Sequence, residues 1–85
     1  MGIYAIERLV ALADVAEFGS ELESVRAVAS VMTAHGQPLY VLHATYVPNH
    51  QRCLCVVEAD DADTVLEALR RIGSHTSSVL PALNL

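Results

Sequence analysis

The chain has 85 residues, which fits one domain with a small hydrophobic core of its own. It is 53% hydrophobic and 18% charged, whereas about 25% charged residues is usual for soluble domains. Ten acidic and five basic residues give a net charge of −5 without any basic cluster, which argues against a nucleic-acid partner, and no apolar run approaches the roughly 20 residues of a membrane span. We expect a homodimer, in which a second copy covers part of this apolar surface.

The first half of the chain predicts a strand followed by a helix. Residues 3–9 are rich in β-branched and aromatic side chains, which is typical of a strand. Residues 14–19 form a looser connector that can begin a helix, and Ser20 with Glu23 three residues later fits a capping box. Gly36 suits the left-handed residue that follows a helix. Between these ends, apolar residues recur at helical spacing (Leu22, Val25, Val28, Ala29 and Met32).

The second half predicts a hairpin, a second helix and a last strand. Residues 39–47 and 52–59 read as strands joined by the turn 48–51. Carboxylates that can cap free N–H groups mark the start of the next helix (Asp60, Asp61 and Asp63). A final strand over residues 77–83 contains Pro81, which a sheet tolerates at an edge.

The predicted order β-α-β-β-α-β is that of an α+β, ferredoxin-like sandwich, with residues 1–85 as a single domain. Its four-stranded antiparallel sheet has the second and fourth strands at the edges and both helices on one face. The other face would expose apolar side chains to water. We therefore expect two sheets to pack face to face, as an α+β barrel dimer with a cavity between them.

The predicted hairpin carries three side chains that could bind a metal: His43, Cys53 and Cys55. Alternation places Val41, His43, Thr45 and Val47 on one face of the first strand, and Cys53, Cys55, Val57 and Ala59 on one face of the second. With three or five loop residues, His43 lies opposite Cys55. With four, it lies opposite Val56, and the cysteines share a face with Ala44 and Tyr46.

The first register would make a metal site. Directly opposed Cβ atoms are about 4.5–5.5 Å apart, so an imidazole and a thiolate could share an ion, and Glu7 on the first strand could add an oxygen. Such a set favours nickel, copper or zinc over magnesium or calcium. The alternative is that Cys53 and Cys55 are core residues, since cysteine usually behaves as a small hydrophobe.

Short motifs along nearly the whole chain resemble one known family. They are Tyr4-Ala5-Ile6-Glu7-Arg8, Tyr46-Val47, Cys55-Val56-Val57-Glu58-Ala59 and Arg70-Arg71-Ile72-Gly73. In these the chain is similar to the small ferredoxin-like nickel-binding proteins, formerly a domain-of-unknown-function family of high-GC bacteria. The resemblance implies a dimeric ferredoxin-like fold and nickel binding, with Cys55 and Glu58 as the first positions to carry over.

Three functions from different classes follow as hypotheses. The first is a small metal- or small-ligand-binding protein whose site lies on the sheet face at a dimer interface. The metal, nickel or another transition metal, would be held by His43, Cys55 and Cys53, and a ligand would contact Glu7, Tyr46 and Glu58. The alternative is a cofactor-free cyclase, isomerase or monooxygenase that uses the barrel cavity, with Glu7, His43 or Tyr46 as general acid or base. A regulatory or scaffold module is a third possibility.

The sequence also predicts a cytoplasmic location. The N-terminus lacks a basic stretch followed by an apolar run, so we expect no signal peptide. Cys53 and Cys55 lie two apart on one predicted strand with parallel side chains, which makes them poor disulfide partners. Both features fit a reducing compartment.

Overall fold

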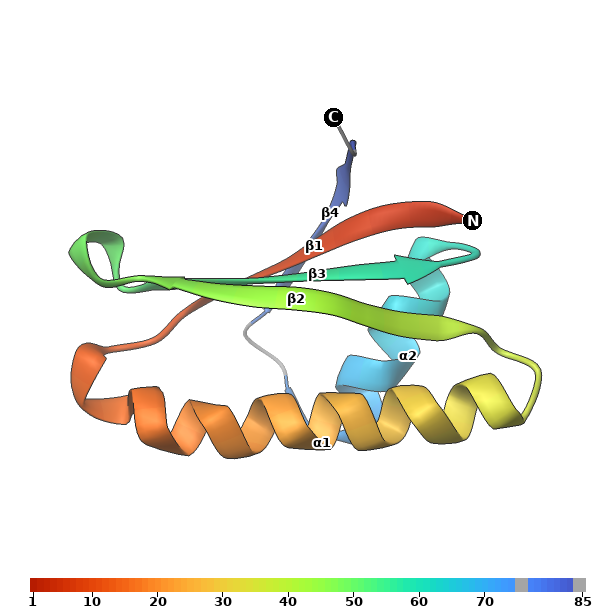
Figure 1. The fold of residues 1–85 in the computed structure, drawn as a ribbon, viewed down its shortest axis with the longest axis horizontal. Coiled ribbons are helices and arrows are strands. Elements are labelled where there is room, and N and C mark those ends of the chain that lie inside the picture. The colour runs from red at the N-terminus through yellow and green to blue at the C-terminus, as the bar shows by residue number, and fades with distance from the viewer. Residues whose placement is uncertain (75–76, 84–85) are drawn as a thin grey trace.

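The computed structural model describes residues 1–74 and 77–83, and it has the predicted α+β, ferredoxin-like order of elements. The elements are β1 (Gly2–Leu9), α1 (Val15–Ala34), β2 (Leu39–Val47), β3 (Arg52–Ala59), α2 (Ala62–Arg71) and β4 (Ser78–Ala82). The four strands form one antiparallel sheet in the order β2-β3-β1-β4, so the second and fourth strands are at the edges as expected. In Figure 1 both helices lie below the sheet.

The first helix begins earlier than the predicted cap at Ser20. A short 3-10 helix (Leu12–Asp14) leads directly into α1 at Val15, so Ser20 lies inside the helix and its carbonyl accepts a bond from the Ser24 hydroxyl. The capping box is therefore not formed. The predicted C-terminal end is confirmed, because Gly36 has φ +86° and the Gln37 N–H donates a 2.9 Å hydrogen bond to the Met32 carbonyl.

The second helix has the ends that its sequence predicts. The Asp61 carboxylate accepts a 2.9 Å bond from the backbone N–H of Thr64, which satisfies one free donor of the first turn. At the other end Gly73 adopts φ +76°. Arg70 and Arg71 lie in the last turn and both pair with Glu67, so the basic residues stand where the helix dipole favours them.

The core lies between the helices and the lower face of the sheet. Buried apolar side chains of β1, β2, β3 and both helices fill it: Ile6, Ala29, Met32, Leu39, Cys55, Val57, Ala59, Val65, Ala68 and Leu69. Met32, Val57 and Val65 are fully buried. None of the described residues is a buried polar or charged one, so packing of apolar groups holds the layers together.

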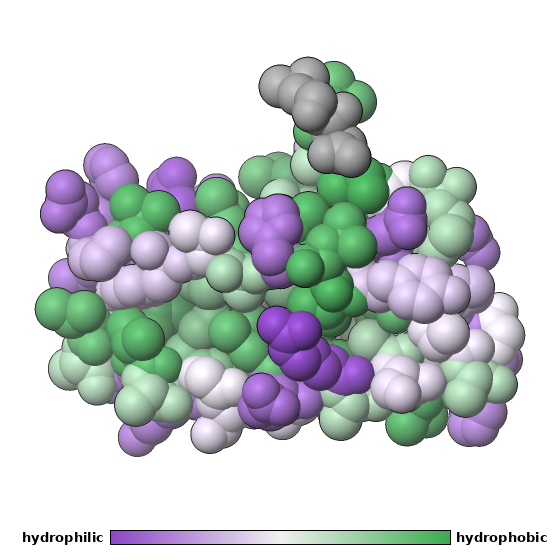
Figure 2. Space-filling model, viewed as in Figure 1, coloured by the Kyte–Doolittle hydropathy of each residue, from purple (hydrophilic) through white to green (hydrophobic). Residues whose placement is uncertain are grey.

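Neither described helix covers the opposite face of the sheet, and we call it the open face (Figure 1). Strand alternation and register assign its residues: Ile3, Ala5, Glu7, Leu9, Tyr40, His43, Thr45, Val47, Arg52, Leu54, Val56, Glu58, Ser78, Leu80 and Ala82. Leu9, Tyr40 and Leu80 on this face are 45–70% exposed. Figure 2 keeps the view of Figure 1, with the sheet above the helices, and shows hydrophobic side chains among hydrophilic ones across this side of the molecule. No described helix has both the length and the apolarity needed to cross a membrane.

Candidate functional site

The hairpin adopts the register of a four-residue turn. Tyr46 lies opposite Cys53, Ala44 opposite Cys55, and His43 opposite Val56. The turn is a short 3-10 helix (Pro48–His50) followed by Gln51 in the left-handed conformation, at φ 50°. The Val10 N–H donates a 2.7 Å hydrogen bond to the Gln51 carbonyl, which joins the turn to the segment after β1.

This register separates His43 from the cysteines. Cys53 and Cys55 face the helices and are each 3% exposed, whereas His43 is exposed on the open face. The cross-strand pair of His43 and Cys55 that the other register would give is therefore not formed. Within residues 1–74 and 77–83, no group of three histidine, cysteine or acidic side chains is arranged to hold a metal ion.

Both thiols are neutral at pH 7. Burial raises the pKa of Cys55 to about 11, and the neighbouring Cys53 adds to the rise while Arg26 opposes it. Burial also raises the pKa of Cys53, against a smaller lowering by the Arg8 guanidinium. Because metals and electrophiles react with the thiolate, the surroundings of both residues disfavour that chemistry. In this structure they pack as small hydrophobic side chains.

Tyr46 also faces the helices and is engaged in the fold. Its hydroxyl donates a 2.7 Å hydrogen bond to the Val10 carbonyl, which joins β2 to the segment that follows β1. Tyr46 thus lies on the cysteine side of the sheet, away from the open face.

The open face brings together the other three predicted site residues, Glu7, His43 and Glu58. His43 and Val56 form a cross-strand row that continues to Ala5, and the carboxylates lie in the two neighbouring rows, one on each side. Glu58 lies opposite Tyr40 of β2, and Glu7 Oε1 lies 3.7 Å from Arg52 Nε. The arrangement is an apolar strip with an imidazole at its β2 end and a carboxylate along each flank.

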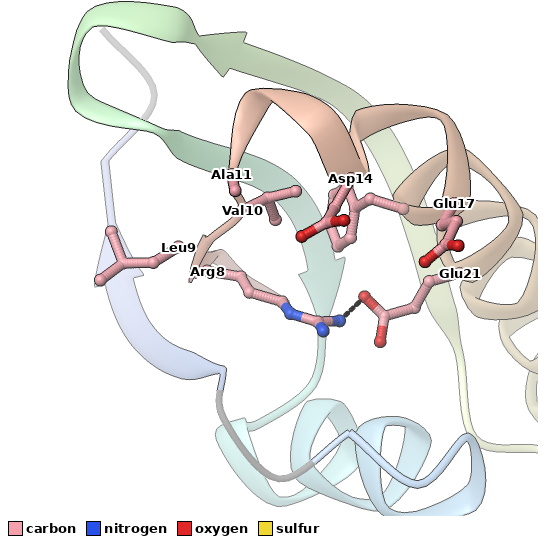
Figure 3. Close-up of a pocket in the computed structure, with 8 residues that line it drawn as sticks. Arg8, Leu9, Val10, Ala11, Asp14, Glu17 and Glu21 are labelled. Carbon is pink, nitrogen blue, oxygen red and sulfur yellow. Dashed lines mark hydrogen bonds and ion pairs between the residues drawn. The ribbon is translucent and has the colours of Figure 1, made fainter.

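A second charged site centres on Arg8, which the sequence analysis did not single out. Its guanidinium lies 5.2 Å from the centre of the Phe18 ring and pairs with Glu21. Together with Asp14 and Glu17, these residues line a cleft between the end of β1 and the start of α1 (Figure 3). One sequence signal was available, because alternation places Arg8 on the same face as Ile6, and a charged residue facing the helices needs a partner.

Comparisons with protein-family models, with curated proteins and with solved structures found no match to this chain. The resemblance to nickel-binding proteins therefore stays a prediction, and the geometry above is the basis for a functional proposal.

Proposed function

We propose that the chain binds a small ligand or a metal ion on the open face of its sheet, between two copies that form an α+β barrel dimer. The observation that carries the proposal is the composition of this face, where Glu7, His43 and Glu58 surround an apolar strip of Ala5 and Val56. Polar groups set in an apolar surface are typical of small-molecule sites.

The dimer follows from the cost of leaving this face in water. Exposed apolar surface costs about 25 cal/mol per Å² relative to burial. On this face Leu80, which pairs with Ala5 of the central strip, is 47% exposed, and Leu9 at the end of β1 is 70% exposed. Stacked sheets lie about 10 Å apart, which suits side chains from two open faces and leaves room for a ligand where those side chains are short. Ala5 is such a short residue at the centre of the face.

In the metal-binding form of the proposal, the ligands are His43 and a carboxylate rather than the cysteines. Among the residues that the structure describes, one copy offers a single imidazole on this face, with Glu58 in the next row. A two-fold axis would double both groups and supply four donors. Imidazole and carboxylate donors suit nickel and zinc among the transition metals.

The test combines oligomeric state with ligand binding. We expect sedimentation velocity to give a dimer at micromolar concentration and titration calorimetry to detect Ni²⁺ binding near neutral pH. His43→Ala should remove Ni²⁺ binding, and Thr45→Ala, the next open-face residue of β2, is the matched control. Val56→Glu should leave a folded monomer, because it places two like charges at the centre of the interface.

Two results would count against the proposal. A monomer at every concentration measured would remove the interface. A dimer that binds neither Ni²⁺ nor Zn²⁺ would exclude metal binding. Small-ligand binding would then be tested by screening small molecules against the wild type and Val56→Glu.

A further inference from the structure

The cleft between β1 and α1 is a mixed-charge cavity of about 300 Å³, on the opposite side of the sheet from the open face. Apolar side chains, Val10 and Phe18 among them, form part of its wall. The charged groups come from two elements, Arg8 from the end of β1, and Asp14, Glu17 and Glu21 from the segment that begins α1 (Figure 3). Its volume is at the lower limit of small-molecule sites, which fits a ligand the size of a single amino acid.

Arg8 retains donors for an acceptor on a ligand. A guanidinium has five N–H groups, and here Nη1 donates to Glu21 while Nε is buried without any hydrogen-bond partner in the described part of the chain. The side chain is 29% exposed and lines the cleft. The guanidinium carbon lies over the Phe18 ring, 5.2 Å from its centre, which is within the range of a cation–π contact. A planar, held guanidinium is the side chain best suited to a carboxylate.

The helix side of the cleft offers the opposite charge. Asp14, Glu17 and Glu21 are spaced three and four residues apart, so they lie along one side of the helix start. Glu21 is engaged by Arg8, whereas Asp14 and Glu17 form no ion pair with any residue that the structure describes. In Figure 3 both carboxylates come from the segment that begins α1, as does that of Glu21.

These charges select against simple ions. A plain anion would meet three carboxylates on its way to Arg8, and a plain cation would leave the guanidinium unused. A molecule that carries an ammonium group beside a carboxylate satisfies both sides of the cleft, and an aliphatic side chain can contact Val10 and Phe18. We infer that this cleft binds a zwitterion, an α-amino acid with an aliphatic side chain, with its carboxylate at Arg8 and its ammonium at Asp14 and Glu17.

The experiment compares three probes that differ by one charge. Titration calorimetry would use L-leucine, 3-methylbutylamine, which lacks the carboxylate, and 4-methylpentanoate, which lacks the ammonium group. We expect L-leucine to bind at least about tenfold more tightly than either analogue, since each lost charge removes a charge-assisted hydrogen bond worth about 1.5 kcal/mol or more.

Variants locate the site. The double variant Asp14→Asn and Glu17→Gln should weaken L-leucine binding by about tenfold or more and leave the weak binding of 4-methylpentanoate unchanged or improved. Glu23→Gln is the matched control, because Glu23 is an exposed carboxylate of the same helix that does not line the cleft. The inference is overturned if 3-methylbutylamine binds as tightly as L-leucine, which would mark a plain cation site, or if no probe binds at millimolar concentration.

Discussion

Replacing Cys55 by serine should destabilise the fold whether or not a metal is present. The side chain is 3% exposed in the core, where its cross-strand neighbours are Ile6 of β1 and Ala44 of β2. A hydroxyl buried there without a partner costs about 1–3 kcal/mol. For a domain of this size each 1 kcal/mol lowers Tm by roughly 4–8 °C, so we expect Cys55→Ser to melt about 4–24 °C below the wild type.

Two further variants separate polarity from size and from metal binding. Cys55→Ala removes the sulfur but adds no polar group, so it should cost about 1 kcal/mol, as the loss of one buried methyl does. His43→Ser changes an exposed residue and should stay within about 0.5 kcal/mol of the wild type. The expected order of stability is therefore His43→Ser, then Cys55→Ala, then Cys55→Ser.

Thermal unfolding followed by circular dichroism, with EDTA and separately with Ni²⁺, provides the measurement. A core role for Cys55 predicts the same loss of Tm in both solutions. The reasoning is refuted if Cys55→Ser melts like the wild type in EDTA and differs from it only with Ni²⁺, because the thiol would then act through a metal and not through packing.

Two other predictions concern pH and a helix cap. The pKa of Cys55 is raised from 9.0 to about 11 in the fold, so the contribution of its thiol to stability is complete below pH 9.0 and is lost as the pH rises towards 11. Urea unfolding between pH 8 and pH 11 should therefore show a fall in the free energy of unfolding. This fall should be smaller in Cys55→Ala. Asp61→Ala should lower the urea midpoint because it removes the bonds that Thr64 donates to the Asp61 carboxylate, whereas Asp61→Asn should lower it less. Equal urea midpoints for both variants would contradict the capping role.

The order of elements could be predicted because local signals and tertiary packing agree. Alternation marks β1 and β3, and the caps at Asp61, Gly36 and Gly73 fix three helix ends. The start of α1 could not be predicted from its cap motif. Ser20 fits a cap locally, but the helix extends back to Val15 and places Phe18 against Arg8, a contact between residues ten apart in sequence that no local pattern contains.

The candidate site depended on a quantity that composition does not fix, the number of residues in the turn. Pro48-Asn49-His50-Gln51 is compatible with odd and even loops, and a change of one residue exchanges the two faces of β2. The structure has the even loop, closed by the bond from Gln51 N–H to the Pro48 carbonyl. Cys53 and Cys55 therefore belong to the core, and the resemblance to a metal-binding family could not reveal this.

A bulge in β2 explains why the predicted assignment of its side chains to the two faces of the sheet was wrong in one half of the strand. Regular alternation puts Val41 and His43 on the same face, but the register shifts between them. Val41 therefore lies opposite Val57 on the core side, and His43 lies opposite Val56 on the open face. An unbulged strand with the same hairpin would place Tyr40, not Leu39, against the buried Ala59. The irregularity thus lets β2 bury Leu39 and Val41 at one end while it keeps His43 on the open face. Because a bulged edge strand also pairs poorly with another edge, it disfavours association of two chains through β2.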